Sequence, residues 1–94
     1  MDPLIRHHRE RILAIAAKHG AGNVRVFGSR ARGTADVDSD ADFLIDIVGP
    51  TTSWFPGGLI NDLQALLGCP VDVGLPTELH PAVKDRVLAE ASPL

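Results

Sequence analysis

The hydrophobic positions of this chain change their spacing several times, and each change marks a new element. Between Asp2 and Gly20, apolar residues recur every three or four positions, which predicts an amphipathic helix. Asp2 followed by proline suits the start of a helix, and Gly20 suits its end. The inner face of this helix is predicted to carry Ile5, His8, Ile12, Ile15, Ala16 and His19.

Two later segments alternate apolar and polar residues, as strands do. Residues 23–27 are predicted to form a strand with Val24 and Val26 inward, and residues 40–48 a second strand. A polar loop joins them. The second strand is predicted to turn three residues toward a core, Phe43, Ile45 and Ile47, and four toward its other face, Asp40, Asp42, Leu44 and Asp46.

The rest of the chain alternates helix, strand and helix. Apolar residues at helical spacing from 59 to 67 predict a helix that Gly68 ends, and residues 70–75 predict a third strand. Because one helix joins the second and third strands, we expect these strands to be parallel. The order αβ(α)βαβα predicts one α/β (α+β) domain over residues 1–94, a small mixed three-stranded sheet flanked by helices. The last helix, from His80 to Ala91, is predicted to turn Val83, Val87 and Leu88 inward.

Composition and charge narrow the class of protein. Hydrophobic residues make up 45% of the 94, as in a folded domain, and no apolar run is long enough for a membrane span. The single Cys69 excludes an internal disulfide, so we expect a cytoplasmic protein. Residues 1–33 hold seven Lys/Arg and two Asp/Glu, whereas residues 34–94 hold two and ten. The net charge of -3 argues against a dedicated nucleic-acid-binding module.

The turn after the first strand carries groups that suit a phosphate. Gly28 allows close approach of the backbone to a ligand, and Ser29 offers a hydroxyl beside the amides of a helical turn. Ser29 is predicted to cap this turn and Gly33 to end it. Arg30 and Arg32 could neutralise phosphate charge. The turn is therefore a candidate nucleotide-binding segment.

Three carboxylates are predicted to form a metal site beside this turn. Asp40 and Asp42 share one strand face, about 6.6 Å apart along the chain. Asp72 is the only acid of the third strand, and it completes the set if that strand lies beside the second. Carboxylate oxygens are the ligands that Mg²⁺ prefers, and Mg²⁺ bridges to substrate phosphates.

Two rival motifs fail on spacing. A calcium-binding loop that begins at Asp36 would need glycine at Ala41 and glutamate at Ile47. A P-loop would need Gly-Lys-Ser/Thr after the glycines, and the chain has none there. Asp46 lies on the same strand face as the candidate metal ligands but farther along, and we expect it to pair with Arg25.

These residues carry a family resemblance. Gly28-Ser29, ten residues and then Asp40-x-Asp42 match the signature of the polymerase-beta-type nucleotidyltransferase superfamily. The surrounding segments resemble the minimal nucleotidyltransferases, the MntA-like antitoxins that are paired with HEPN-domain toxins. The resemblance continues through Asp72 and covers most of the chain. It implies the nucleotidyltransferase fold.

The resemblance also implies a reaction. The protein would attack the α-phosphate of a nucleoside triphosphate, ATP, transfer AMP and release pyrophosphate. Two Mg²⁺ ions would be bound by Asp40, Asp42 and Asp72, with Asp72 as base toward the attacking hydroxyl. Gly28 and Ser29 would hold the β- and γ-phosphates. The acceptor would be a tyrosine of a HEPN toxin, and we expect contact with nucleic acid only through that partner and none with a membrane.

Two alternatives stay open. The protein could silence a toxin by contact without turnover, using its basic first helix and the loop that contains Trp54 and Phe55. It could also modify a small molecule. That activity needs an added acceptor-binding domain, for which 94 residues leave no room unless an oligomer supplies one. The two aromatic residues could instead simply cover the edge of the core.

Overall fold

The segments with alternating apolar residues form the centre of the molecule. The computed structural model describes residues 2–94 and contains a four-stranded sheet in the order β3-β2-β1-β4. The strands are β1 (Ala21–Phe27), β2 (Ala41–Ile47), β3 (Val71–Gly74) and β4 (Ser92–Pro93). The helices are α1 (Pro3–His7), α2 (Arg9–Lys18), α3 (Ser29–Arg32), α4 (Gly57–Leu67), the 3₁₀ helix η1 (Pro76–Glu78) and α5 (Pro81–Glu90). The predicted fold class is confirmed.

Strand pairing follows the prediction with one addition. β1 runs antiparallel to β2, and β2 runs parallel to β3, to which it is connected through α4. β4 pairs antiparallel with β1, Arg25 opposite Pro93 and Val26 opposite Ser92, so the predicted three-stranded sheet gains a fourth strand. β4 was not predicted, because its two residues are too few to show an alternating pattern. Proline is tolerated in β4 because this strand lies at the edge of the sheet.

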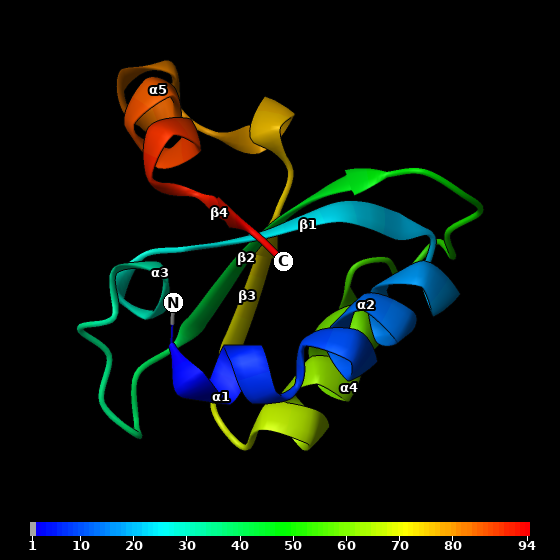
Figure 1. Ribbon diagram of the computed structural model, residues 1–94. Helices are drawn as coiled ribbons and strands as arrows, with labels where there is room; N and C mark the ends of the chain where they lie inside the picture. Colours follow the sequence, from blue (N-terminus) through cyan, green and yellow to red (C-terminus); the bar gives the residue numbers. More distant parts are fainter. Residues whose placement is uncertain (1) are drawn as a thin grey trace.

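Helices lie on both sides of the sheet (Figure 1). α1, α2 and α4 gather on one side, and α5 lies on the other. The buried core lies between the sheet and the first group of helices, which present apolar residues at helical spacing. Its members include Ile5, Ile12, Ala16, Leu59, Leu63 and Leu67 from the helices, Val24, Val26, Phe43, Ile45, Val71 and Val73 from the strands, and Cys69. Within residues 2–94, no helix combines the length and apolar character needed to cross a membrane.

The first predicted helix is divided by a change of direction at His8. This residue has φ -102° and ψ 13°, and it separates α1 from α2. Helical hydrogen bonds continue across it, because the His8 amide donates to the Leu4 carbonyl at 3.3 Å and the Ile12 amide donates to the His8 carbonyl at 2.9 Å. Ile5 and Ile12 therefore both reach the core, although the prediction of one continuous helix was wrong.

Two residues predicted to face the core are exposed. Ile47 is 51% exposed, and Leu88 is 37% exposed. β3 pairs with β2 only as far as Gly74 opposite Leu44, so Ile47 lies beyond the shorter strand and has no β3 residue opposite it. α5 contains no buried residue, which makes it a peripheral helix. The prediction of inward packing was therefore too strong for all three of its apolar residues, Val83, Val87 and Leu88.

Leu63→Ala should lower the free energy of unfolding by about 2–5 kcal/mol, because the lost side chain leaves a cavity in the core. Leu63 of α4 is 2% exposed. The same change on α5, Leu88→Ala, should cost less than about 0.5 kcal/mol and serves as the matched control. Urea unfolding of both variants measures the difference. A loss at Leu88 as large as that at Leu63 would contradict the peripheral position of α5.

An ion pair joins α2 to α4. His19, the residue that ends α2, has its Nε2 2.7 Å from Oδ2 of Asp62, and Lys18 Nζ lies 3.8 Å from the same oxygen. The hydrogen bond with His19 is the main cause that lowers the pKa of Asp62 below its usual 3.8. His19 was predicted to face inward, and its side chain is 20% exposed. His19 therefore lies at the edge of the core, where it forms a polar contact between α2 and α4.

Asp62→Asn should make the stability of the protein less sensitive to acid. A carboxylate whose pKa is lowered by folding stabilises the fold above its unfolded pKa, and this stabilisation is lost as the pH falls through the folded value. We therefore expect the wild type to lose stability more steeply than Asp62→Asn between about pH 5 and pH 2. Thermal unfolding across this range measures the effect. Parallel curves for the two proteins would show that the pair contributes nothing.

Candidate functional site

Three residues in register across the sheet define the site. Phe27, the last residue of β1, lies opposite Asp42 of β2, and Asp42 lies opposite Asp72 of β3. Neighbouring strands are about 4.8 Å apart, and residues directly opposite each other point to the same face. The side chains of Asp42 and Asp72 therefore lie side by side. This arrangement confirms the expectation that the third strand lies beside the second.

The turn that follows β1 contacts Asp42. Gly28 has φ +73°, and a Cβ atom built on it would lie 2.9 Å from Oδ2 of Asp42. Gly28 itself occupies the cap position of α3, so the predicted cap, Ser29, is instead the first helical residue. Gly33 ends α3 in the left-handed conformation, as predicted. The missing side chain at Gly28 thus lets the backbone of the turn approach the carboxylate.

Asp40 lies just outside this pair. It precedes the first residue of β2 and is exposed. The next amide, that of Ala41, donates to the carbonyl of Pro70 at 2.9 Å, so the chain is already held to the start of β3. Among residues 2–94, no three His, Cys, Asp or Glu side chains stand together as a ready-made metal-binding group. The described site is therefore the pair Asp42 and Asp72, with Asp40 at its border.

The charges of these acids favour a bound cation. Burial raises the pKa of Asp42 above its usual 3.8, and the charges of Asp72 and then Asp40 raise it further. Like charges held close together disfavour the ionised form, and a divalent cation removes this repulsion. Carboxylate oxygens are hard donors of the kind that Mg²⁺ prefers. The donor set therefore fits Mg²⁺.

The two arginines of α3 differ in their surroundings. Arg30 is 2% exposed, and its Nη1 donates to Oδ2 of Asp2 at 3.0 Å. This burial corrects the expectation that Arg30 contacts a nucleotide. Arg32 is exposed, and its Nη1 lies 3.4 Å from Oε2 of Glu90 on α5. Exposed pairs of this kind are weak, so Arg32 remains available to an anionic ligand.

The other acids of this region have separate roles. Asp46 accepts from Nη2 of Arg25 at 3.0 Å, as predicted, and also from the side-chain amide of Asn23 at 2.8 Å. Asp36 and Asp38 are exposed, as loop acids should be. The carboxylate of Asp36 also accepts from the Asp38 amide at 3.2 Å. This hydrogen bond within the loop was not predicted from the sequence. These acids do not join the carboxylate pair.

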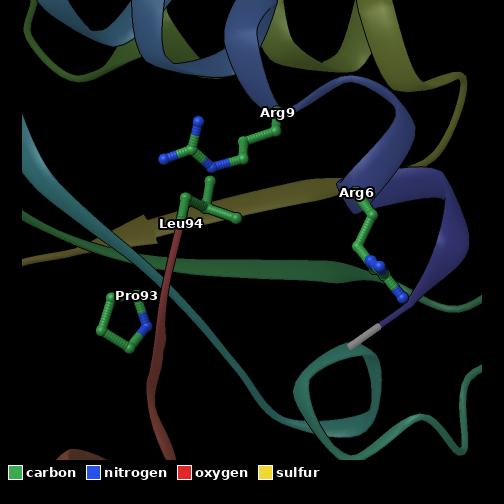
Figure 2. A pocket seen from close by; sticks show the side chains of 4 residues that line it. All are labelled: Arg6, Arg9, Pro93 and Leu94. Carbon is green, nitrogen blue, oxygen red and sulfur yellow. The ribbon is translucent and has the colours of Figure 1, made fainter.

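A cavity of about 410 Å³ lies elsewhere, between the first helices and β4 (Figure 2). In this view Arg9 extends over Leu94, and Arg6 comes from the preceding helix. The cavity is lined by Arg6, Arg9, Pro93 and Leu94, and by none of the three candidate carboxylates. Since Asp40 and Asp72 are exposed, the candidate site is an open part of the sheet rather than a closed pocket.

The sequence matches known proteins over most of its length. Residues 9–93 match a family model described as a nucleotidyltransferase domain. A protein of Methanocaldococcus jannaschii, provisionally named a protein adenylyltransferase, is 34% identical over 87 residues, which cover 93% of this chain and 94% of the relative. The protein adenylyltransferase MntA of Thermococcus cleftensis is 33% identical over 87 residues, which cover 93% of this chain and 84% of the relative.

Solved structures resemble the fold as well. One, described provisionally as a minimal nucleotidyltransferase, superposes with a TM-score of 0.83 at 44% identity, covering 100% of this chain and 97% of the other. A toxin–antitoxin structure with AMP-PNP gives a TM-score of 0.74 at 17% identity, covering 89% of this chain and 69% of the other. The second likeness is one of fold alone.

Proposed function

Because this chain belongs to the nucleotidyltransferase domain family and is a nucleotidyltransferase, we propose that it transfers AMP from ATP to a partner protein. The resemblance to MntA-like minimal nucleotidyltransferases is confirmed by the relatives and by the structural neighbour. The observation that carries the proposal is the register of Asp42 with Asp72, against which Gly28 brings the backbone of the phosphate-binding turn.

The three acids are proposed to hold two Mg²⁺ ions. Asp42 and Asp72 are adjacent on neighbouring strands, and Asp40 precedes Asp42 by two residues. When bound, Mg²⁺ supplies positive charge to the phosphates and stabilises the charge that develops during transfer. The raised pKa of Asp42 supports this assignment, because the like charges of its neighbours are part of the cause.

The other groups of the site would bind the phosphates and accept a proton. The backbone at Gly28 and the hydroxyl of Ser29 would hold the β- and γ-phosphates, and Arg32 would exchange Glu90 for the charge of the leaving pyrophosphate. Asp72 would accept the proton of the attacking hydroxyl. The hydroxyl oxygen then bonds to the α-phosphorus, the bond from that phosphorus to the bridging oxygen breaks, and pyrophosphate leaves with the bonding electrons.

The proposed acceptor is a tyrosine of a HEPN-domain toxin, modified in the cytoplasm. The names of the two relatives, protein adenylyltransferases, support a protein acceptor, and one of them is MntA. The same fold occurs in a toxin–antitoxin structure with AMP-PNP, so it can accommodate both a toxin partner and an adenine nucleotide. An open site supports a large acceptor, since the exposed Asp40 and Asp72 leave room for one.

ATP labelled at either the α- or the γ-phosphate tests the proposal. The protein is incubated with Mg²⁺ and a candidate HEPN partner, and the label on each protein is measured. We expect the α-label on the partner, no γ-label, and loss of labelling when EDTA removes the metal. Transfer of the γ-label would instead indicate phosphorylation, and a partner free of both labels would contradict a protein acceptor.

One observation favours a second function, silencing of the toxin by contact alone. Trp54, in the loop before α4, is 65% exposed, whereas Phe55 packs against the core. Exposed tryptophans are frequent anchors of protein interfaces. If inhibition of the toxin survived in a double variant, Asp40→Asn with Asp42→Asn, and disappeared in Trp54→Ala, contact rather than transfer would be the mechanism.

A further inference from the structure

Arg30 connects the phosphate-binding turn to the segment that carries Asp40. The residue follows Gly28-Ser29 directly, yet its side chain is 2% exposed. Its Nη2 and Nε both donate to the carbonyl oxygen of Ser39, at 2.7 and 3.2 Å. That carbonyl belongs to the peptide group between Ser39 and Asp40. A planar guanidinium that donates two bonds to one oxygen holds the peptide group in both position and direction.

Asp2 anchors the other end of the guanidinium. Arg30 Nη1 lies 3.0 Å from Oδ2 of Asp2, and the two side chains are 2% and 9% exposed. The same oxygen accepts from the amide of Ile5 at 3.2 Å, and the amide of Asp2 donates to the Arg30 carbonyl at 3.0 Å. Removing one partner of a buried charge pair leaves an uncompensated charge. Arg30 and Asp2 therefore depend strongly on each other.

The peptide group on the other side of Asp40 is held as well. The amide of Ala41 donates to the carbonyl of Pro70 at 2.9 Å, directly before β3. Asp40 thus lies between two fixed peptide groups, while its own side chain is exposed. Its backbone position relative to Asp42, two residues later, is therefore determined by Arg30 on one side and by β3 on the other.

We propose that Arg30 is a positioning residue, which holds Asp40 where its carboxylate can join those of Asp42 and Asp72 at the cation. The role of the three acids rests on the proposed function, whereas the link from Arg30 to Ser39 is a property of the fold. This role accounts for an arginine of the phosphate-binding turn that points into the protein rather than toward a ligand.

Arg30→Lys tests this role in the full chain without nucleotide. Lysine keeps the charge and can reach either Asp2 or the Ser39 carbonyl, but one ammonium group cannot reproduce the fork that bonds both. We expect the midpoint of a Mn²⁺ titration to rise about tenfold, as when other supports of a metal ligand are removed. Amide hydrogen exchange in residues 36–40 should become at least about tenfold faster.

Ile12→Val is the control, because it weakens the core away from this loop by a modest amount. It should lower the thermal midpoint but leave loop exchange and the Mn²⁺ midpoint unchanged. If Arg30→Lys folds too poorly, Asp2→Asn keeps the helix cap, removes the paired charge and should shift both readouts in the same direction.

Two outcomes separate this role from its alternatives. If Arg30→Lys behaves like Ile12→Val, with loop exchange and Mn²⁺ binding unchanged, the arginine is purely structural and the inference is overturned. If both readouts depend on Arg30 but the wild type transfers no label from ATP, the positioning role is supported and the proposed function fails.

Discussion

Asp42→Asn should lower the rate of nucleotidyl transfer by at least about 10³-fold, because Asp42 is proposed to bind the metal and a lost ligand removes several kcal/mol of transition-state stabilisation. The same change should make the free protein more stable. Burial and the charges of Asp72 and Asp40 raise the pKa of Asp42 above its usual value, so its ionised form opposes folding at neutral pH. Because the group is partly exposed and screened, we expect a gain of less than about 1 kcal/mol.

The two effects are measured by transfer of α-label and by thermal unfolding at several pH values. The gain in stability should shrink as the pH falls through the raised pKa, since Asp42 of the wild type then becomes protonated. Asp38→Asn is the matched control, because it removes one charge from an exposed acid of the preceding loop. It should leave transfer near the wild-type rate. Equal losses of transfer in both variants would contradict a specific role for Asp42.

Gly28→Ala should damage both the fold and the activity. Its backbone angles, φ 73° and ψ -153°, lie in a region that is essentially restricted to glycine, and occupying it with another residue costs about 1–3 kcal/mol. The new Cβ would also lie 2.9 Å from Oδ2 of Asp42 and push the carboxylate from its place. We expect transfer per folded molecule to fall about 10²-fold, the usual cost of a misplacement near 1 Å.

Gly33→Ala separates backbone strain from the collision. Gly33 also has a positive φ of 76°, but a Cβ there would meet nothing within 4 Å. This variant should lose about 1 kcal/mol of stability and keep its activity once the folded fraction is accounted for. Urea unfolding and label transfer provide both values. Comparable transfer in the two variants would show that the approach of Gly28 to Asp42 has no functional importance.

Local patterns were sufficient for most of the fold and for the central carboxylate pair. Alternation located three strands, and the helix between β2 and β3 predicted that these strands run parallel, which places Asp42 beside Asp72. β4 could not be predicted, because its two residues have no pattern of their own and are held only by pairing with β1. The exposure of Ile47 depends on where β3 stops, which alternation within β2 does not report.

The role of Arg30 could not be predicted from its neighbours in the sequence, for a similar reason. Its place in the turn indicated phosphate binding, whereas its burial depends on Asp2, which lies 28 positions earlier. Ser39, its other partner, is a backbone acceptor, and backbone acceptors carry no mark in the sequence. Arg32, two residues later, has a similar local sequence but remains exposed. Tertiary contacts alone distinguish the two arginines.

The edges of the sheet affect how this protein can bind other chains. At one edge, β4 has only two residues, and Pro93 lacks an amide hydrogen. At the other edge, the amide of Val71 in β3 donates to the side chain of Gln64 at 3.1 Å. Each edge therefore has one backbone position that cannot donate to an added strand, a feature that disfavours edge-to-edge pairing. We therefore expect a partner to recognise side chains and loops rather than to extend the sheet.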